Sequence, residues 1–155
     1  MAVEDDLSLI LHFIEKLADY ERLRDMCVAS EDKLRVTLFG ERPAAEVLIA
    51  SIDDEPAGFA LFFHNYSTFL AQRGVFLEDL FVNPDSRGRG VGRALLARLA
   101  QIAIERDCGR LEWFVLDWND LAISFYRSLG ALPMDDWTMF RLTGPALANL
   151  AENSP

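Results

Sequence analysis

The sequence is poor in the residues that most often bind metals or form crosslinks. Its 155 residues include only two cysteines and two histidines. Cys27 and Cys108 are far apart and fit neither a metal-binding nor a redox spacing, so we expect free thiols in a reducing, cytoplasmic environment. His12 and His64 are isolated in the sequence, and we therefore predict no metal site.

The sequence also lacks long apolar runs and an excess of positive charge. No run approaches the ~18 apolar residues of a membrane span, and the opening segment 1–6 is acidic, unlike a signal peptide. The formal net charge of −10 argues against a nucleic acid partner, because cationic side chains neutralise phosphates in such complexes. It suits a cationic substrate, whose local concentration an acidic cleft would raise, or it serves solubility alone.

Apolar content and periodicity predict a single domain, residues 1–155, built from helices and strands. Hydrophobic residues make up 51% of the chain, enough for a core. Helical spacing and capping residues predict helices at 7–22, 31–39, 90–106, 120–129 and 146–152. Runs of β-branched and aromatic residues predict strands at 45–53, 57–66, 75–82, 110–117 and 134–142. The first two strands should form an antiparallel hairpin, and the helix between residues 82 and 110 predicts a parallel crossover, so the sheet should be mixed.

A glycine-rich turn follows the third predicted strand. The segment Arg87-Gly-Arg-Gly-Val-Gly-Arg93 has glycines at alternate positions, which let the backbone turn tightly and bring N–H groups close to a ligand. The next helix adds unpaired N–H donors and the positive end of its dipole, so the turn suits a pyrophosphate. It is neither a P-loop, which needs Gly-Lys-Ser/Thr, nor a dinucleotide fingerprint, because position 93 is arginine. The alternative is an ordinary glycine-rich turn.

Two adjacent acids, Glu78 and Asp79, lie inside that third, otherwise apolar strand. A buried carboxylate is costly unless it is paired or functional. Neighbours in a strand point to opposite faces, so only one of the two should serve a given site. We favour Glu78 as the functional acid, and a structural role is the alternative for each.

A third candidate cluster follows the fourth predicted strand. Asn119 stands where that strand ends and a helix begins, and Tyr126 comes two helical turns later on the same face. Both side chains could therefore border one groove. The alternative makes Asn119 a helix cap and Tyr126 a packed aromatic residue.

Together these residues resemble the GNAT N-acetyltransferases. The segment Arg87–Gly92 matches the acyl-CoA signature R/Q-x-x-G-x-G/A of that superfamily, between a strand and a helix. Within it, the chain is most similar to the diamine (spermidine/spermine) and thialysine acetyltransferases. The shared segments are Leu77-Glu-Asp-Leu-Phe-Val82, Trp118-Asn119, Phe125-Tyr126, Gly130-Ala131 and Ala18-Asp-Tyr-Glu21. The resemblance implies an α+β, three-layer fold: a mixed, mostly antiparallel twisted sheet with helices on both faces and a splayed pair of parallel strands.

The resemblance also implies a role for each matched position. Acetyl-CoA would be the co-substrate, with no metal, and the acceptor would be a small cationic amine such as a polyamine, diamine or thialysine. Tyr126 would protonate the leaving thiolate, and Glu78 would bind the amine and help to deprotonate it through water. The acyl-CoA contacts would come from Leu80, Phe81, Val82, Arg87, Gly88, Arg89, Gly90, Val91, Gly92, Arg93, Asn119 and Tyr126. The amine pocket would be lined by Tyr20, Glu21, Glu78, Glu112, Trp113 and Phe114.

The sequence departs from the family pattern at both ends. The family has an edge strand before the first helix, and few residues precede that helix here, so we expect this strand to be absent or truncated. The acidic segment before the last strand is also shorter, and Asp135 or Asp136 would take the place of a substrate-binding acid. The family further implies a homodimer. The apolar final strand and the tail 147–150 could supply its interface, and the alternative is that they pack internally.

Two other functions fit the same residues. One is a protein or peptide N-acetyltransferase, which needs an open groove for a peptide backbone. The other is a catalytically idle acyl-CoA-binding module, against which the joint presence of Glu78 and Tyr126 argues.

Overall fold

The computed structural model describes residues 1–153. These residues form two compact units, one comprising Met1–Phe114 and the other beginning at Val115. The first unit contains the sheet and the helices that cover it. The second contains two helices and the extended segments beside them.

The sheet of the first unit has four strands in the order β1-β2-β3-β4. The strands are β1 (Glu46–Ile52), β2 (Glu55–Ser67), β3 (Gln72–Val82) and β4 (Leu111–Trp113). β1–β2 and β2–β3 are antiparallel, whereas β3 and β4 are parallel. The predicted hairpin, parallel crossover and mixed sheet are therefore confirmed.

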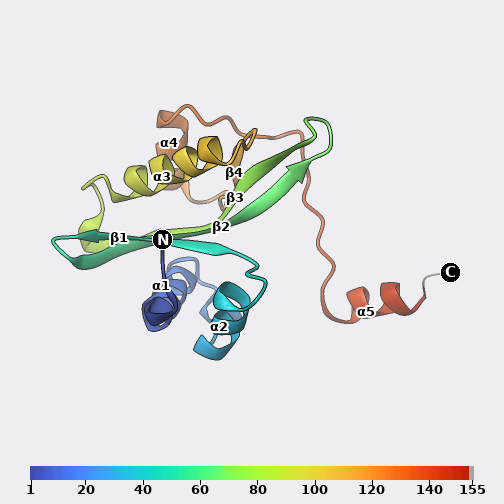
Figure 1. Ribbon diagram of the computed structural model, residues 1–155. Coiled ribbons are helices and arrows are strands. Elements are labelled where there is room, and N and C mark those ends of the chain that lie inside the picture. The colour runs from blue at the N-terminus through green and yellow to red at the C-terminus, as the bar shows by residue number, and fades with distance from the viewer. Residues whose placement is uncertain (154–155) are drawn as a thin grey trace. The chain divides into compact units, whose positions relative to one another are not determined.

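Helices cover both faces of this sheet. They are α1 (Leu7–Tyr20), α2 (Glu31–Phe39) and α3 (Val91–Glu105), with short 3-10 turns η1 (Glu4–Asp6), η2 (Arg24–Met26) and η3 (Pro84–Ser86). α1 and α2 lie on one face and α3 on the other (Figure 1). The layered arrangement that the sequence predicts is thus present within this unit.

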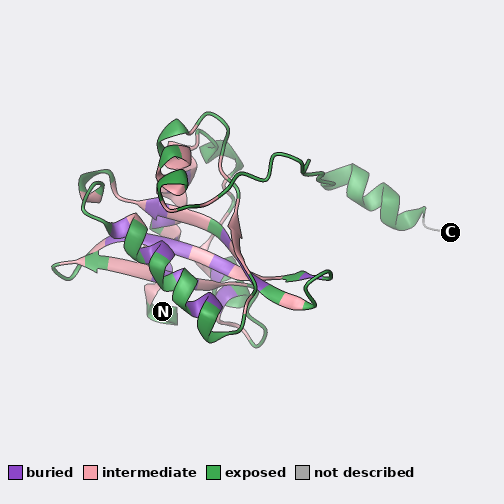
Figure 2. Cartoon of the chain, turned by 90° about the horizontal axis from the view of Figure 1, so that it is seen from above, coloured by how far each residue is buried: buried purple, intermediate pink, exposed green. Residues whose placement is uncertain are grey.

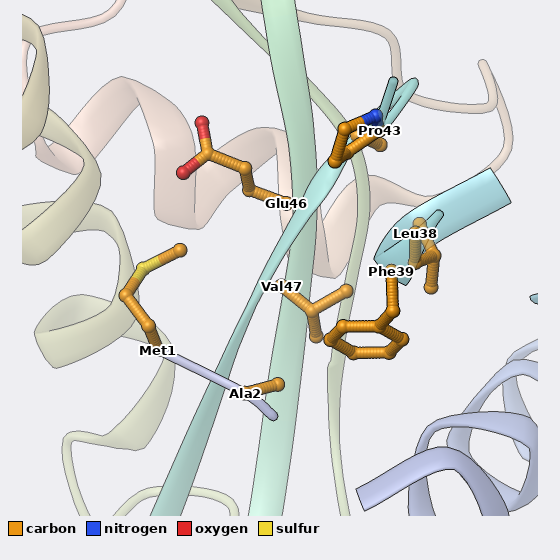
Figure 3. Close-up of a pocket in the computed structure, with 8 residues that line it drawn as sticks. Met1, Ala2, Leu38, Phe39, Pro43, Glu46 and Val47 are labelled. Atoms are coloured by element: carbon orange, nitrogen blue, oxygen red, sulfur yellow. The ribbon is translucent and has the colours of Figure 1, made fainter. Parts of the chain in front are cut away.

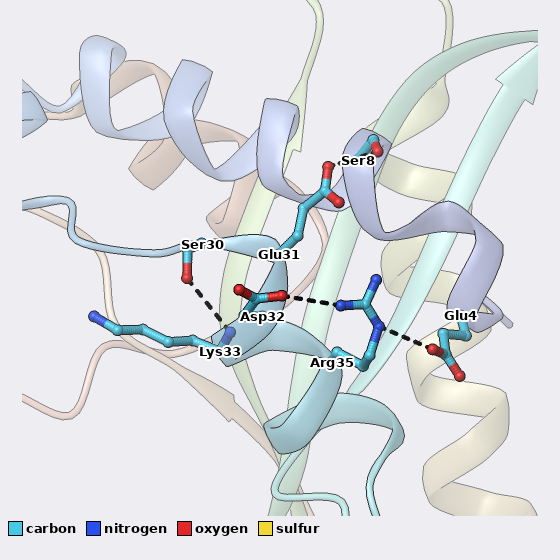
Figure 4. Close-up of polar contacts among 7 residues, drawn as sticks. All are labelled: Glu4, Ser8, Ser30, Glu31, Asp32, Lys33 and Arg35. Atoms are coloured by element: carbon cyan, nitrogen blue, oxygen red, sulfur yellow. Dashed lines mark hydrogen bonds and ion pairs between the residues drawn. The ribbon is translucent and has the colours of Figure 1, made fainter.

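Local sequence signals explain how α1 and α2 form. In α1 the buried residues recur every three or four positions, which produces one apolar face toward the sheet. Ser30 caps α2, since its Oγ accepts a hydrogen bond from the Lys33 N–H at 3.4 Å. Figure 4 shows this cap together with the ion pair between Arg35 and Glu4, 3.0 Å apart, which joins α2 to the start of the chain.

The core has one layer on each side of the sheet. On the α1 side, the Phe13 and Phe59 rings stack with their centroids 5.4 Å apart, and Phe81 packs beside them. On the α3 side, Leu99 and Ile102 are almost fully buried. Figure 2 shows the buried residues along the strands and helices of the first unit, whereas α5 (Gly144–Glu152) is exposed throughout.

The outer edge of β1 is partly covered by the start of the chain. The Ala2 N–H donates to the Val47 carbonyl at 2.8 Å, although residues 1–3 form no strand. Beside this contact lies a small pocket of about 190 Å³ (Figure 3). Its walls are Met1, Ala2, Leu38, Phe39, Pro43, Ala45, Glu46 and Val47.

In the second unit, α4 (Asp120–Ser128) and α5 match the predicted helices to within two residues. The predicted final strand, Met134–Leu142, is wrong: these residues form a turn and irregular backbone, and all are exposed. A strand is maintained by ladder hydrogen bonds to a neighbour, and this segment pairs with no strand among residues 1–153. Its apolar and polar residues match the pattern of a strand, but that pattern does not supply a partner.

We expect Leu99→Ala to lower the free energy of unfolding by about 2–5 kcal/mol, because the removed atoms leave a cavity in a fully buried site. Ile104→Ala, on the same helix but 80% exposed, should change it by less than about 0.5 kcal/mol. Urea unfolding of both variants measures the difference. Equal losses would contradict the position assigned to α3 against the sheet.

Candidate active site

A β-bulge interrupts β3 at the acidic pair. Leu61 of β2 pairs with Asp79, but the next residue, Phe62, pairs with Leu77, so Glu78 is an extra residue without a partner on β2. A bulge breaks the alternation of side chains between the two faces. Regular alternation, which the sequence predicts for this strand, therefore does not separate Glu78 from Asp79 at this point.

The bulge gathers three carboxylates. Leu61 packs against the core cluster below α1, and cross-strand partners share a face, so Asp79 lies on that same face. Burial first, and then the charges of Glu78 and Glu21, raise the pKa of Asp79 to about 6. Glu21, directly after α1, also has a raised pKa because it is partly buried. Asp79, the less favoured acid of the pair in the sequence, is thus close to both acids predicted to bind the amine.

The pairing of β3 with β4 ends just before the bulge. It covers only Val75–Leu77 opposite Leu111–Trp113, although the sequence predicted a fourth strand reaching residue 117. Further along β3, the Asn83 N–H donates to the Ala57 carbonyl, which fixes which residues bond to β2. The pattern turns the main-chain groups of Leu80 and Val82 away from β2, toward the side on which β4 no longer pairs.

This register separates the three residues predicted to hold the cofactor arm. Leu80 and Val82 present N–H and C=O groups to the open side of β3. Phe81, by contrast, bonds to Phe59 of β2 through its main chain and buries its side chain in the core. Within this segment, an extended ligand could therefore hydrogen bond to Leu80 and Val82 as an added strand would.

The glycine-rich turn has the backbone of an anion cradle. Gly88 and Gly90 have φ angles of +74° and +85°, a left-handed conformation that favours glycine. Gly90 is the N-cap of α3 and provides no side-chain hydrogen bond, so the N–H groups of Val91 and its neighbours at the helix start lack a capping side chain. Arg89 and Arg93 are exposed beside this turn, and Arg89 lies 3.8 Å from Asp53.

Arg87 connects the cradle to the end of α1. Its Nε donates to the Val82 carbonyl at 3.2 Å. Its guanidinium carbon lies 4.9 Å from the centroid of the Tyr20 ring, within the range of a cation–π contact. A residue predicted for the phosphate site therefore contacts one predicted for the amine pocket.

The remaining pocket candidates of this unit are on or just after β4. Glu112 accepts a hydrogen bond from Asn65 and lies 2.8 Å from Nε of Arg110, so its charge is already paired. Phe114 contacts the Phe76 ring edge-on, with a centroid distance of 5.2 Å. Trp113 forms the last pair with β3. Glu112 is thus less available to a substrate cation than the acids at the bulge.

The other candidates belong to the second unit. Asn119 caps α4, with its Oδ1 accepting from the Ala122 N–H at 3.2 Å. Tyr126 lies two turns further along α4, with its ring 5.5 Å from that of Phe125. Asp135 and Asp136 form an exposed turn.

Neither a metal-binding group nor a membrane-spanning helix is found among residues 1–153. They contain no group of three or more His, Cys, Asp or Glu side chains that could hold a metal ion, and this applies to the three acids at the bulge. Within the same residues, no helix has both the length and the apolar character needed to cross a membrane.

A bulged strand with open main-chain groups, followed by a glycine cradle and a helix, fits an acyl-CoA site. The Acetyltransferase (GNAT) family matches residues 14–131, which span both units. The chain belongs to this family and is a GNAT acetyltransferase.

Individual relatives cover almost the whole chain. The thialysine N-epsilon-acetyltransferase of Bos taurus is 37% identical, over 97% of this chain and 94% of its own. The L-ornithine N5-acetyltransferase of Arabidopsis thaliana is 33% identical, over 95% and 84%. Among solved structures, an integron cassette protein from the mobile metagenome of V. cholerae is 31% identical, with a TM-score of 0.78 over 97% of this chain and 91% of that one.

We expect Asp79→Asn to stabilise the protein at pH 8 by on the order of 2–3 kcal/mol. The folded-state pKa, about 6, lies above the ordinary 3.8, so the folded protein binds more protons between these values. The contribution of Asp79 to stability is therefore lost as pH rises through this window. Asparagine does not ionise, and the difference from wild type should disappear toward pH 4.

Urea unfolding at pH 4 and pH 8 measures this effect. Asp54→Asn, an exposed acid in the β1–β2 turn, is the matched control and should show no comparable dependence. A variant at position 79 no more stable than wild type at pH 8 would rule out the raised pKa.

Proposed function

We propose that the chain transfers the acetyl group of acetyl-CoA to the primary amine of a small cationic substrate, such as a polyamine, diamine or thialysine-like amine. The observation that carries this proposal is the group of three carboxylates, Glu21, Glu78 and Asp79, at a bulge beside open main-chain groups of β3. An acidic group attracts a cation, and the open strand suits an amide-containing arm.

In this proposal acetyl-CoA supplies the activated acetyl thioester. Its pantetheine amides would bond to the main chain of Leu80 and Val82. Its pyrophosphate would lie on the N–H groups around Gly88–Gly92, with Arg87, Arg89 and Arg93 adding positive charge. The left-handed glycines, the uncapped start of α3 and the open side of β3 support this assignment.

The acids would bind the amine and remove its proton. A primary amine of pKa near 10.4 is about 99.9% protonated at pH 7 and cannot attack a thioester in that form. Glu78 would accept the proton through water. Asp79, with a pKa of about 6, is a second candidate base, because a base titrating near the working pH transfers protons efficiently.

Tyr126 would donate a proton to the thiolate of CoA as it leaves, and Asn119 would contact the cofactor. Their places at the N-cap and near the end of α4, two turns apart, and the family match that extends to residue 131 support this assignment. Asn119 also caps its helix, so it would serve the fold as well.

Relatives support the choice of acceptor. The names of the two enzymes described above specify acetylation of side-chain amino groups of thialysine and ornithine, both small and cationic. Together with the three acids at the bulge, this favours a small amine over a protein N-terminus.

We expect measurable release of CoA with one or more amines from a panel of polyamines, diamines, thialysine and ornithine. Tyr126→Phe should lower kcat by about 10²–10⁴, the usual effect of removing a general acid. Tyr66→Phe, an exposed tyrosine on the β2–β3 hairpin, is the matched control and should behave as wild type. A thiol-reactive dye provides the measurement.

Three other outcomes are informative. No turnover with any amine, despite demonstrated acetyl-CoA binding, would favour an acyl-CoA-binding module without catalysis. Acetylation of peptides in preference to amines would favour a protein N-acetyltransferase. Unchanged kcat in Tyr126→Phe would remove that residue from the mechanism.

A cytoplasmic homodimer consisting of single-domain chains belongs to the same proposal. Large apolar side chains are exposed in the second unit, including Trp137 at 74% and Phe140 at 91%. We expect sedimentation equilibrium to give twice the chain mass of 17.5 kDa, and Phe140→Asp to shift the protein toward monomer. Phe69→Asp, equally exposed in the first unit, should not. A monomeric wild-type protein would refute the dimer.

A further inference from the structure

We propose that Tyr20 is a positioning residue of the acyl-CoA site, because its ring holds the Arg87 guanidinium in place for the pyrophosphate. The inference rests on the proposed function, since it concerns the same site, but it assigns Tyr20 a second role beyond lining the amine pocket. Tyr20 would then couple the two binding sites.

α1 contacts the segment after β3 at two positions, one helical turn apart. Lys16 donates through Nζ to Oδ1 of Asn83 at 3.3 Å, and the Tyr20 ring lies against the Arg87 guanidinium. Residues four apart share one face of a helix. The contact between Tyr20 and Arg87 is therefore part of a larger interface between α1 and residues 83–87.

The backbone that carries Arg87 is held in place. Asn83 donates through Nδ2 to the Pro56 carbonyl at 2.9 Å, and the N–H groups of Ser86 and Arg87 close the η3 turn by donating to the carbonyls of Asn83 and Pro84. Only the side chain of Arg87 remains to be oriented. Two contacts do this: the Val82 carbonyl and the Tyr20 ring.

These contacts use different parts of the guanidinium. Nε bonds to Val82, and the guanidinium carbon lies over the Tyr20 ring. The two terminal nitrogens point in the guanidinium plane, where arginine binds phosphate oxygens as a pair. A side chain already held in its binding conformation loses less entropy when the ligand arrives.

Tyr20 is followed directly by Glu21, one of the three acids at the bulge. A cation that binds Glu21 therefore also orders the end of α1 that carries Tyr20. Because coupling between two sites is reciprocal, each ligand should raise the affinity for the other by the same factor. Tyr20 and Arg87 form the physical contact between the two sites.

The test is isothermal titration of CoA into wild type, Tyr20→Phe and Tyr20→Leu. Phenylalanine keeps the ring face and should bind CoA within twofold of wild type. Leucine removes it and should weaken CoA about two- to fivefold, the value of an exposed cation–π contact. In an Arg87→Gln background, Tyr20→Leu should have no further effect, because the partner is already gone.

Several results would overturn the inference. One is that Tyr20→Leu binds CoA as tightly as wild type. Another is that Tyr20→Leu weakens CoA binding equally with Arg87 present and in the Arg87→Gln background. Should Tyr20→Leu fail to fold, Tyr20→Gln tests the same contact, and circular dichroism of each variant excludes a merely structural loss. In kinetics the effect should appear in the KM for acetyl-CoA, and a change confined to kcat would refute it. Wild type that binds no CoA would overturn the proposed function as well, whereas CoA binding without amine turnover would overturn only the latter.

Discussion

Glu78 is the residue of β3 that has no partner on β2, and the strand takes a different role on each side of it. Before the bulge, Val75–Leu77 continue the sheet into β4. After it, β3 bonds to β2 alone, and Leu80 and Val82 face the opposite side. Main-chain groups that find no partner in a sheet are costly unless water or a ligand satisfies them. The bulge therefore leaves part of a central strand as an open edge, and it also places the acids beside that edge.

The end of α1 contacts both the acidic group and Arg87 of the glycine-rich turn. The helix is fixed by apolar packing, with Phe13 stacked on Phe59 in the core between the helix and the sheet. Tyr20, the last residue of the helix, contacts Arg87. Glu21, the next residue, lies close enough to Asp79 to raise its pKa. Both contacts depend on how α1 is oriented about its own axis. A change in the packing of α1 would consequently alter both sites at once, even without a substitution in either.

The sequence correctly predicts those structural elements whose signals come from residues close together in the chain. The periodicity of α1, the Ser30 cap and the glycines before α3 locate their elements closely, because each signal is local. The bulge at Glu78 has no such signal, since it is defined by the register against β2. The wrong prediction of a final strand has the same origin. Residues 134–142 have the pattern of a strand, but the local sequence does not specify the partner strand that they would need. The preference for Glu78 over Asp79 has the same weakness, because it depends on a regular alternation that the register breaks at this point.

The electrostatics of the bulge also bear on which amine fits. Burial is the largest cause of the raised pKa of Asp79, and the negative charges of Glu78 and Glu21 add a repulsion. A bound cation relieves it, so binding and ionisation of Asp79 favour each other. One ammonium group compensates one of three negative charges, whereas a substrate with two ammonium groups compensates more of them. The chain has a net charge of −10, and Glu112 is already paired with Arg110. A bound substrate would therefore compensate the charges of the acids at the bulge. The arrangement therefore favours a polyamine, diamine or diamino acid over an amine with a single charge.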